Sequence, residues 1–299
     1  MNQYDLLIDE MLSKPQSKVM NLKISQLHPF EGHPYKVLDD ESMEVLTESI
    51  RTQGVLTPLV VRPLGNEEYE VISGHRRLLA CKKAGISSVP ALVHDIDRDQ
   101  AAIALVDSNL HREHILPSEK ACAYKLKMEA LKRQGQRTDL TSGQVGPKLR
   151  ADEVIAQEAD DSARQIKRYI RLTNLIPGIL QKVDDGKIAL TPAVELSYLT
   201  DTEQADLLET MESEDCTPSL SQAQQMKALS QSGQLDMDKI FAIMTQPKAN
   251  QQEKISFKVS ELRNYFPKHY TPAQMMQEII LAVKERQQRL QRQRNRDAR

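Results

Sequence analysis

The chain has 299 residues, which is roughly two domains at about 150 residues each. Hydrophobic residues make up 39% of it, Trp is absent and aromatic residues are only 4%, so packed cores are expected but a turn-rich β-sandwich or propeller is not. Cys81, Cys122 and Cys216 lie far apart without CxxC spacing, which argues against a disulfide framework or a zinc knuckle. No apolar run approaches the ~20 residues of a membrane span and the start is acidic, so we expect a protein of the reducing cytoplasm.

The net charge of −2 is the sum of acidic stretches and three basic segments. Residues 284–299 hold seven Lys or Arg against two acids, and residues 162–172 and 75–83 each hold four cations without an acid. Separate basic patches allow a near-neutral protein to bind phosphate groups locally.

The first hundred residues alternate helix and strand patterns. The predicted elements, in chain order, are a flexible arm over 1–20, a helix over 40–54, strands over 55–62 and 68–73, a helix over 75–84, a strand over 89–95 and a helix over 97–110. Asp40 is the expected N-cap and Gly54 the stop of the first helix. Asp97 and Gln100 have capping-box spacing. We therefore predict a small α/β domain over 21–116.

After Pro117 the strand pattern largely ends. The predicted elements are a helix over 118–134, a polar joint over 133–151, short helices over 152–230, a Gln- and Asn-rich linker ending near 254, a strand over 254–262 and a helix over 271–293. Thr271, Pro272 and Gln274 give the last helix an N-cap, a first-turn proline and a capping box. We predict an all-helical domain over 117–232, then a linker and a C-terminal dimerisation or basic helix over 233–299.

Residues 152–172 have the pattern of a helix-turn-helix. Ala156 and Ala159 are small enough for close helix crossing, and Asp160-Asp161 stands in the turn, where Asp tolerates the left-handed conformation. Ser162 would cap a second helix with Ile166 and Ile170 inward, and its outward face shows Arg164, Gln165, Lys167 and Arg168. These side chains can bond phosphates and base edges. The alternative is the solvated face of an ordinary helical hairpin.

A second candidate site is ISGHRRLLA, residues 72–80, where a strand ends at Gly74 and a helix begins with His75-Arg76-Arg77. Two arginines in a first turn oppose the helix dipole, which makes sense if a di- or triphosphate binds there. The alternative is a surface-charged helix start. In residues 107–114, Asn109 and Arg112 offer an amide and a guanidinium, whereas the His111–His114 pair lacks the companions of a metal site.

Three stretches, in order and at the right spacing, resemble the ParB/Spo-type chromosome and plasmid partition family. They are GVLTPLVVR…YEVISGHRRLLACKKAG (54–85), SNLHREHILPSEKA (108–121) and DGKIALTPAVELSYL (185–199), with the helix-turn-helix between the last two. The resemblance covers roughly residues 20–230. It implies an α+β protein: a small sulfiredoxin-like α/β domain, then an all-α helix-turn-helix domain and a helical C-terminal region.

The function that this resemblance implies is sequence-specific binding of a centromere-like (parS-type) DNA site in plasmid, mobile-element or chromosome segregation, as a CTP-dependent clamp. It implies CTP and Mg²⁺ as cofactors, and double-stranded DNA, a second copy of the chain and a ParA-type ATPase as partners, with no membrane. The protein would lie in the cytoplasm on the nucleoid or a plasmid. The alternatives are a helix-turn-helix transcriptional regulator without a segregation role and, ranked third, a ParB-like nuclease or nucleotide hydrolase.

Carried over by position, the resemblance implies two sets of site residues. The nucleotide set is Thr57, Ser73, Gly74, His75, Arg76, Arg77, Ser108, Asn109 and Arg112, with Asn109 also at Mg²⁺. The DNA set is Ser162, Arg164, Gln165, Lys167, Arg168 and Arg171. His75 and Ser108 replace two family glutamates, so binding without rapid hydrolysis is expected, and Asp107 is the nearest acid. Gly74 stands where sulfiredoxin has its active cysteine, which excludes thiol chemistry.

Overall fold

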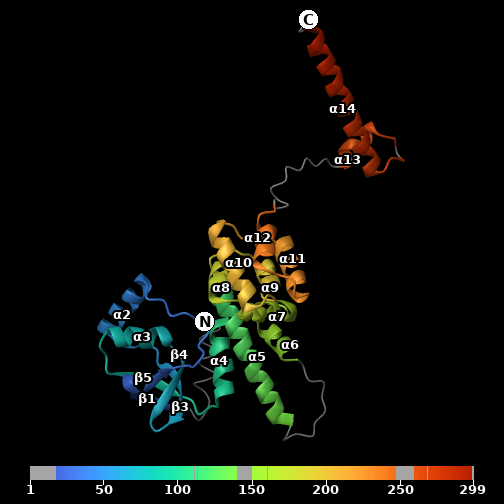
Figure 1. Cartoon of the computed structure of the whole chain (residues 1–299). Coiled ribbons are helices and arrows are strands. Elements are labelled where there is room, and N and C mark those ends of the chain that lie inside the picture. The colour runs from blue at the N-terminus through green and yellow to red at the C-terminus, as the bar shows by residue number, and fades with distance from the viewer. Residues whose placement is uncertain are drawn as a thin grey trace. The chain divides into compact units, whose positions relative to one another are not determined.

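A computed structural model describes residues 18–110, 112, 114–139, 150–159, 161–246, 259–267 and 269–297. The chain divides into two compact units, Met1–Gln246 and Pro247–Arg299, each of which is described by itself (Figure 1). Within these described ranges, no helix is both long enough and apolar enough to cross a membrane.

The first unit begins with a five-stranded mixed sheet (Figure 1). Its strands, in spatial order, are β1 (Lys18–Lys23), β5 (Ser88–Val93), β3 (Leu59–Gly65), β4 (Glu68–Ser73) and β2 (Leu27–Pro29). β1 is antiparallel to β5, β3 is antiparallel to β4, and the β3–β5 and β2–β4 pairs are parallel. The three predicted strands are present. β1 and β2, joined by the 3₁₀ turn η1 (Ile24–Gln26), were not predicted, and residues 1–17 of the predicted arm lie outside the described residues.

Alternate residues of β3 face two different helical layers. Leu59 and Val61 pack with α2 (Glu41–Gln53) and α3 (His75–Lys83), whereas Val60 packs with α4 (Arg98–Leu110) and part of α5 (Pro117–Asp139). This is the period of two that a strand buried on both faces requires. The predicted α/β fold of this part of the chain is therefore confirmed, with the sheet between two helical layers.

The predicted helix ends agree with the structure. The Asp40 side chain accepts the Met43 N–H at the start of α2, and Gly54 ends the helix with a φ of +73°. Asp97 and Gln100 form both bonds of the capping box before α4. These features depend on local sequence, which is why they could be predicted.

Helix α5 packs against both halves of the first unit. Ala123 and Ala130 lie in the core beneath the sheet, and Tyr124, on another side of the helix, packs with Ile155 and Ile166 of the helical half. The helix runs to Asp139, five residues beyond its predicted end at 134. Residues 140–149 of the predicted joint lie outside the described residues.

The helical half follows α5 and is built from short helices. They are α6 (Ala151–Glu158), α7 (Ala163–Arg171), the 3₁₀ turn η2 (Leu172–Asn174), α8 (Pro177–Asp184), α9 (Leu190–Leu196), α10 (Asp201–Ser213), α11 (Leu220–Gln231) and α12 (Met237–Met244). Their shared core includes Leu172, Ile179 and Leu207. α8 contacts α10 at Gly178, where a Cβ would clash with Leu208 Cδ2 unless the leucine side chain moved.

The second unit contains α13 (Val259–Leu262), the 3₁₀ turn η3 (Arg263–Tyr265) and α14 (Pro272–Asp297). The capping box between Thr271 and Gln274 is present. The predicted strand over 254–262 is wrong for 259–262, which are helical, and 254–258 lie outside the described residues. The β-branched pattern there had favoured a strand, but α13 continues directly into η3.

Candidate functional site

A cavity of about 580 Å³ opens where the N-terminus of α3 meets the C-terminal end of α4. Seven of the residues predicted to bind the nucleotide line this cavity: Ser73, Gly74, His75, Arg76, Arg77, Asn109 and Arg112. The fold therefore brings together two motifs that are more than thirty residues apart in the sequence. The sequence had not indicated a third part of the wall, which the β2–α2 loop and α2 contribute with His33, Tyr35, Lys36, Ser42 and Ser49.

The other two residues predicted to bind the nucleotide, Thr57 and Ser108, do not line the cavity but form hydrogen bonds with residues that do. The Thr57 carbonyl accepts a hydrogen bond from Arg77 Nη1 at 2.5 Å. The Ser108 hydroxyl donates to the Leu105 carbonyl and accepts from Asn109 Nδ2 at 3.1 Å. Neither residue is among those that line the cavity. Both positions therefore act on the cavity through a neighbour.

The charged side chains that line the cavity are all positive. The described lining residues include the cations Lys36, Arg76, Arg77 and Arg112 and no carboxylate. Cationic side chains and helix N-terminal amides are the groups that hold phosphate oxygens. This wall therefore favours an anionic ligand with several charges.

Gly74 is the N-cap of α3 and lies at the centre of this wall. Its φ is +103°, in the region that favours glycine, and a Cβ there would lie 3.1 Å from Leu59 Cγ and 3.2 Å from Arg77 Nη2. Without a side chain, Gly74 cannot cap the first-turn amides of α3, which therefore need another partner. A phosphate group is a suitable partner for such amides.

The two arginines of the first turn are held differently. Arg77 Nη1 donates to the Thr57 and Pro58 carbonyls at 2.5 and 2.8 Å, which fixes its guanidinium against the segment before β3. Arg76 Nη2 donates to the Ser42 hydroxyl at 2.5 Å, and its side chain is 46% exposed. Arg76 can therefore turn toward a ligand more easily than Arg77.

Two histidines form a neutral, partly buried pair in the wall. The ring centroids of His33 and His75 are 3.8 Å apart, and the Phe30 N–H donates to His75 Nε2 at 3.4 Å. Burial, with His33 and Arg112 nearby, lowers the pKa of His75 to about 3, and burial also lowers the pKa of His33. Both rings are therefore neutral at pH 7.

The Tyr35 phenol is buried beside this pair. Arg112 Cζ lies 5.4 Å from the centroid of its ring. Burial raises the pKa of Tyr35, and within the described residues its hydroxyl has no hydrogen-bond partner. The phenol is therefore neutral at physiological pH.

Asn109 is the residue expected at Mg²⁺. Its Nδ2 donates to the Leu105 carbonyl at 2.7 Å and to Ser108 Oγ at 3.1 Å, which leaves the side-chain oxygen as the group available to a cation. The described residues contain no cluster of three His, Cys, Asp or Glu side chains that could hold a metal. One amide oxygen fits Mg²⁺ only if phosphate oxygens supply further ligands.

Asp107, the nearest acid in sequence, is directed elsewhere. Its carboxylate pairs with the buried Lys127 of α5, which also pairs with Glu158 of α6. Asp107 is not among the residues that line the cavity. The structure therefore gives it no position from which to replace a missing glutamate.

The helix-turn-helix is formed by α6 and α7. Ile155 and Ile166 are fully buried between them, and Ser162 Oγ accepts the Gln165 N–H at 3.3 Å, as the sequence predicted. The reason proposed for Asp161 was wrong: it is not among the residues with positive φ, and its carboxylate instead accepts hydrogen bonds from Lys120 Nζ and Tyr124 OH. Asp160 lies outside the described residues.

The cationic side chains of α7 that were predicted to bind DNA differ in how many contacts they make with the rest of the protein. Arg164 is exposed, and its guanidinium has no hydrogen-bond partner in the described part of the chain. Lys167 pairs with Asp152 at 2.7 Å, and Arg168 donates to Gln165 and to Thr191 of α9. Lys167 and Arg168 therefore contact the neighbouring helices α6 and α9, whereas Arg164 makes no such contact in the described part of the chain.

Arg171 is the most firmly held of this set. Its Nη2 donates to the Ser197 carbonyl at 3.0 Å, and its guanidinium carbon lies 3.9 Å from the centroid of the Tyr198 ring. The contacts of Arg171 therefore join α7 to the end of α9.

Comparisons with known proteins find relatives of this chain. Residues 9–110 match the ParB N-terminal domain. The probable chromosome-partitioning protein ParB of Pseudomonas putida is 30% identical over 201 residues, which are 67% of this chain and 63% of that protein. The chromosome-partitioning protein Spo0J of Thermus thermophilus is 33% identical over 193 residues, 64% of each chain. The chain therefore spans less than two thirds of the length of these relatives.

Solved structures of Caulobacter crescentus ParB, C-terminally truncated, are also similar in sequence. The complex with the centromeric parS site has a TM-score of 0.40 at 22% identity, over 71% of this chain and 99% of that one. The complex with CTP-gamma-S has a TM-score of 0.30 at 25% identity, over 65% and 99%. Scores this low do not define a common whole-chain arrangement.

Fold and site thus define a protein with a ParB-type N-terminal domain followed by a helix-turn-helix. Residues 9–110 are a ParB N-terminal domain, and the chain is related to ParB and Spo0J proteins over about two thirds of its length.

Proposed function

We propose that this chain is a DNA-binding partition protein that recognises a parS-type site and binds CTP with Mg²⁺. One observation carries the nucleotide part: the described wall of the cavity has four cations, no carboxylate and a glycine N-cap at a helix N-terminus. The names of both relatives, which describe proteins of chromosome partitioning, support the DNA part.

The residues of the cavity wall suit a triphosphate. The amides after Gly74 and the guanidinium of Arg76 would bind phosphate oxygens, with Arg77 and Arg112 adding positive charge. Mg²⁺, when bound through phosphate oxygens and the Asn109 side-chain oxygen, would neutralise part of the phosphate charge. The neutral His33–His75 pair would form an uncharged part of the wall.

The same wall argues for binding without rapid turnover. His75 is a neutral imidazole where the family has a glutamate, and the Asp107 carboxylate is paired with Lys127 outside the cavity, so neither residue supplies a carboxylate that could orient a water molecule. We expect phosphate release from CTP to be slow or absent, with and without cognate DNA.

DNA would bind along the outer face of α7. Arg164, Gln165 and Arg168 would reach base edges in the major groove, and Ser162, Lys167 and Arg171 would bond phosphates or position the helix. A second copy of the chain and a ParA-type ATPase are the expected protein partners. The complex would lie in the cytoplasm, on nucleoid or plasmid DNA.

Two experiments test the proposal. A melting scan of the full chain with each of the four ribonucleoside triphosphates and Mg²⁺ should show a shift with CTP, and no shift would reject the nucleotide site. DNA pull-down with sequencing, with and without CTP, should recover one short motif. Enrichment of no motif in either condition would reject sequence-specific DNA binding.

A further inference from the structure

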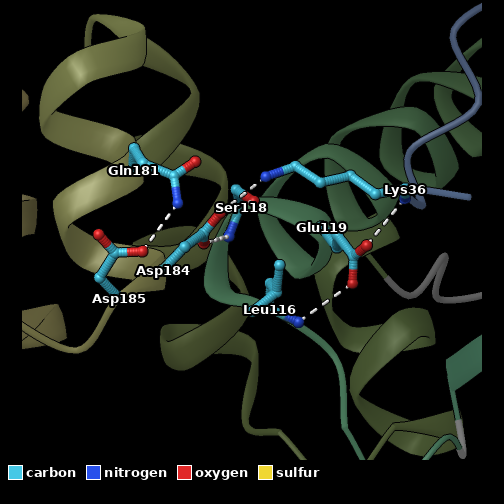
Figure 2. A network of polar contacts seen from close by, with 7 residues as sticks. All are labelled: Lys36, Leu116, Ser118, Glu119, Gln181, Asp184 and Asp185. Carbon is cyan, nitrogen blue, oxygen red and sulfur yellow. Dashed lines mark hydrogen bonds and ion pairs between the residues drawn. The ribbon is translucent and has the colours of Figure 1, made fainter. Parts of the chain in front are cut away.

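The loop between β2 and α2 forms part of the cavity wall and also contacts the helical half of the protein. His33, Tyr35 and Lys36 of this loop line the cavity. On the other side, the Lys36 N–H donates to Glu119 Oε1 of α5 at 2.8 Å, and Lys36 Nζ donates to Asp184 Oδ2 of α8 at 3.4 Å. Figure 2 shows the Lys36 side chain extended toward Asp184 and Ser118. Lys36 therefore belongs to the cavity while its ammonium is bound elsewhere.

Asp184 is the centre of this contact. It is the last residue of α8, and its side chain is only 3% exposed. It accepts the Ser118 N–H at 3.0 Å and the Ser118 hydroxyl at 2.6 Å, so it caps the first turn of α5 (Figure 2). These two bonds account for the position of Asp184 without Lys36, since the lysine adds only the longest of its three contacts.

The Lys36 ammonium can leave Asp184 for a partner that binds it more strongly. The lysine side chain is 49% exposed and the N–O distance of 3.4 Å is long for an ion pair, so water competes with Asp184 for the ammonium. A polyphosphate in the cavity would offer the same ammonium several anionic oxygens next to Arg76 and Arg112. The flexible four-carbon stem of lysine allows this change without movement of its backbone.

We propose that Lys36 is a further phosphate-binding residue of the cavity and that Asp184 competes with the ligand for its ammonium. This inference rests on the proposed nucleotide site. An anionic ligand takes the Lys36 ammonium and thereby removes the charged contact between the cavity loop and α8. The backbone bond from Lys36 to Glu119 and the Ser118 bonds to Asp184 remain, so the loop stays attached to α5 but no longer to α8.

The test is a double-mutant cycle on the full chain, with CTP and Mg²⁺ binding measured by calorimetry. Asp184→Asn removes the competing charge and keeps an acceptor for the Ser118 N–H. It should tighten CTP binding by about two- to fivefold, the factor for release of one partly exposed ion pair. Lys36→Met should weaken binding. In the Lys36→Met background, Asp184→Asn should have no further effect, because no ammonium is left to release.

Ser118→Ala is the matched control, because it removes a bond to Asp184 and leaves the Lys36 pair in place. It should not tighten CTP binding. The melting temperature of each variant without nucleotide measures how much stability is lost with the α5 cap, separately from any change in CTP affinity. The competition would be overturned, and the proposed nucleotide site would stand, if Asp184→Asn changed CTP affinity equally in the unaltered chain and in the Lys36→Met background. The same would hold if Asp184→Asn did not tighten CTP binding at all. No binding of CTP to the unaltered chain would overturn the proposed nucleotide site together with this inference.

Discussion

The imidazole rings of His33 and His75 lie 3.8 Å apart, centroid to centroid, in the wall of the cavity. His33 Nδ1 is bonded to the Tyr35 carbonyl at 2.8 Å, and His75 Nε2 accepts from Phe30 N–H. Two partly buried rings this close cannot both carry a proton without strong repulsion. The pair therefore keeps a region next to the first-turn amides of α3 uncharged.

This pair makes stability depend on pH. In the unfolded chain His75 has its ordinary pKa of 6.5, whereas in the folded chain burial lowers this pKa to about 3. The unfolded state therefore holds more protons between these values, and the free energy of unfolding falls as the pH is lowered from 6.5 toward 3. His75 alone contributes a slope of up to about 1.4 kcal/mol per pH unit.

Urea unfolding of the chain at pH 7.5, 6 and 5 measures this slope. His75→Gln should flatten it, because glutamine does not titrate. His114→Gln, which changes an exposed histidine that does not line the cavity, is the control and should retain the slope of the unaltered protein. An identical slope in the His75 variant would show that other groups cause the acid sensitivity.

Gly74 gives a second prediction, since its backbone and its surroundings both exclude a side chain. Gly74→Ala would place a residue at φ +103° and a methyl group 3.1 Å from Leu59 Cγ, at a cost of about 1–3 kcal/mol of stability. CTP at a hundred times its dissociation constant should stabilise the unaltered protein by about 2.7 kcal/mol. In the variant this stabilisation should be lost, as measured by thermal melting.

Gly65→Ala is the matched control for backbone strain. Gly65 has a φ of +97°, but a Cβ there would meet nothing within 4 Å, and the residue does not line the cavity. It should lower the melting temperature and leave the shift caused by CTP intact. Loss of the shift in both variants would mean that strain in the domain, rather than the Gly74 position, controls binding.

Much of the fold could be predicted because its determinants are local. The caps at Asp40, Ser162 and Thr271 and the stop at Gly54 act within one helical turn, and each is present. β3 and β4 each contain three consecutive buried residues, and such short apolar, β-rich runs bounded by turn residues can be recognised in the sequence.

The missed elements depend on contacts between distant segments. β1 is an edge strand with Val19 exposed, and it pairs with β5 about seventy residues later, so its own pattern is weak. The cavity loop has no motif of its own. His33 and Lys36 meet Gly74 and Asn109 only because the sheet and α4 place all three segments together. No spacing rule within the sequence could have found them.

The outer face of α7 gives a third prediction. Arg164→Ala removes an exposed guanidinium that has no bond partner in the described residues, so the fold should be unaffected. If Arg164 reaches a base, its loss should cost about 1–3 kcal/mol of affinity and relax specificity at one base pair. Footprinting on the recovered DNA motif and its single-base variants measures both.

Lys167→Ala is the comparison on the same helix. It removes a phosphate-type cation that is paired with Asp152, and it should weaken all DNA sequences alike. If both variants keep the site preference of the unaltered protein, α7 is not the helix that reads the DNA sequence.

The last prediction concerns the seven cations of residues 284–299. α14 is helical to Asp297, and the described side chains of Lys284, Arg286 and Arg289 are exposed. We expect them to contact DNA phosphates without sequence preference. Their loss should lower affinity for nonspecific DNA and flatten the slope of log K against log salt by about 0.9 for each phosphate contact removed.

The change should be made by substitution as well as by deletion. Deleting 284–299 also removes Leu290, which belongs to an exposed apolar stripe of α14. The other members of this stripe are Met276, Ile280 and Val283, spaced by four and three residues, and Leu290 follows seven residues after Val283 because Gln287 interrupts the pattern. A variant with Gln in place of Lys284, Arg286, Arg289 and Arg292 removes charge but retains the stripe. If both changes flatten the salt slope, the cations bind DNA. If the slope changes only on deletion, the apolar stripe acts by pairing two chains, which doubles the DNA contacts of each complex, and the cations are a solvated face.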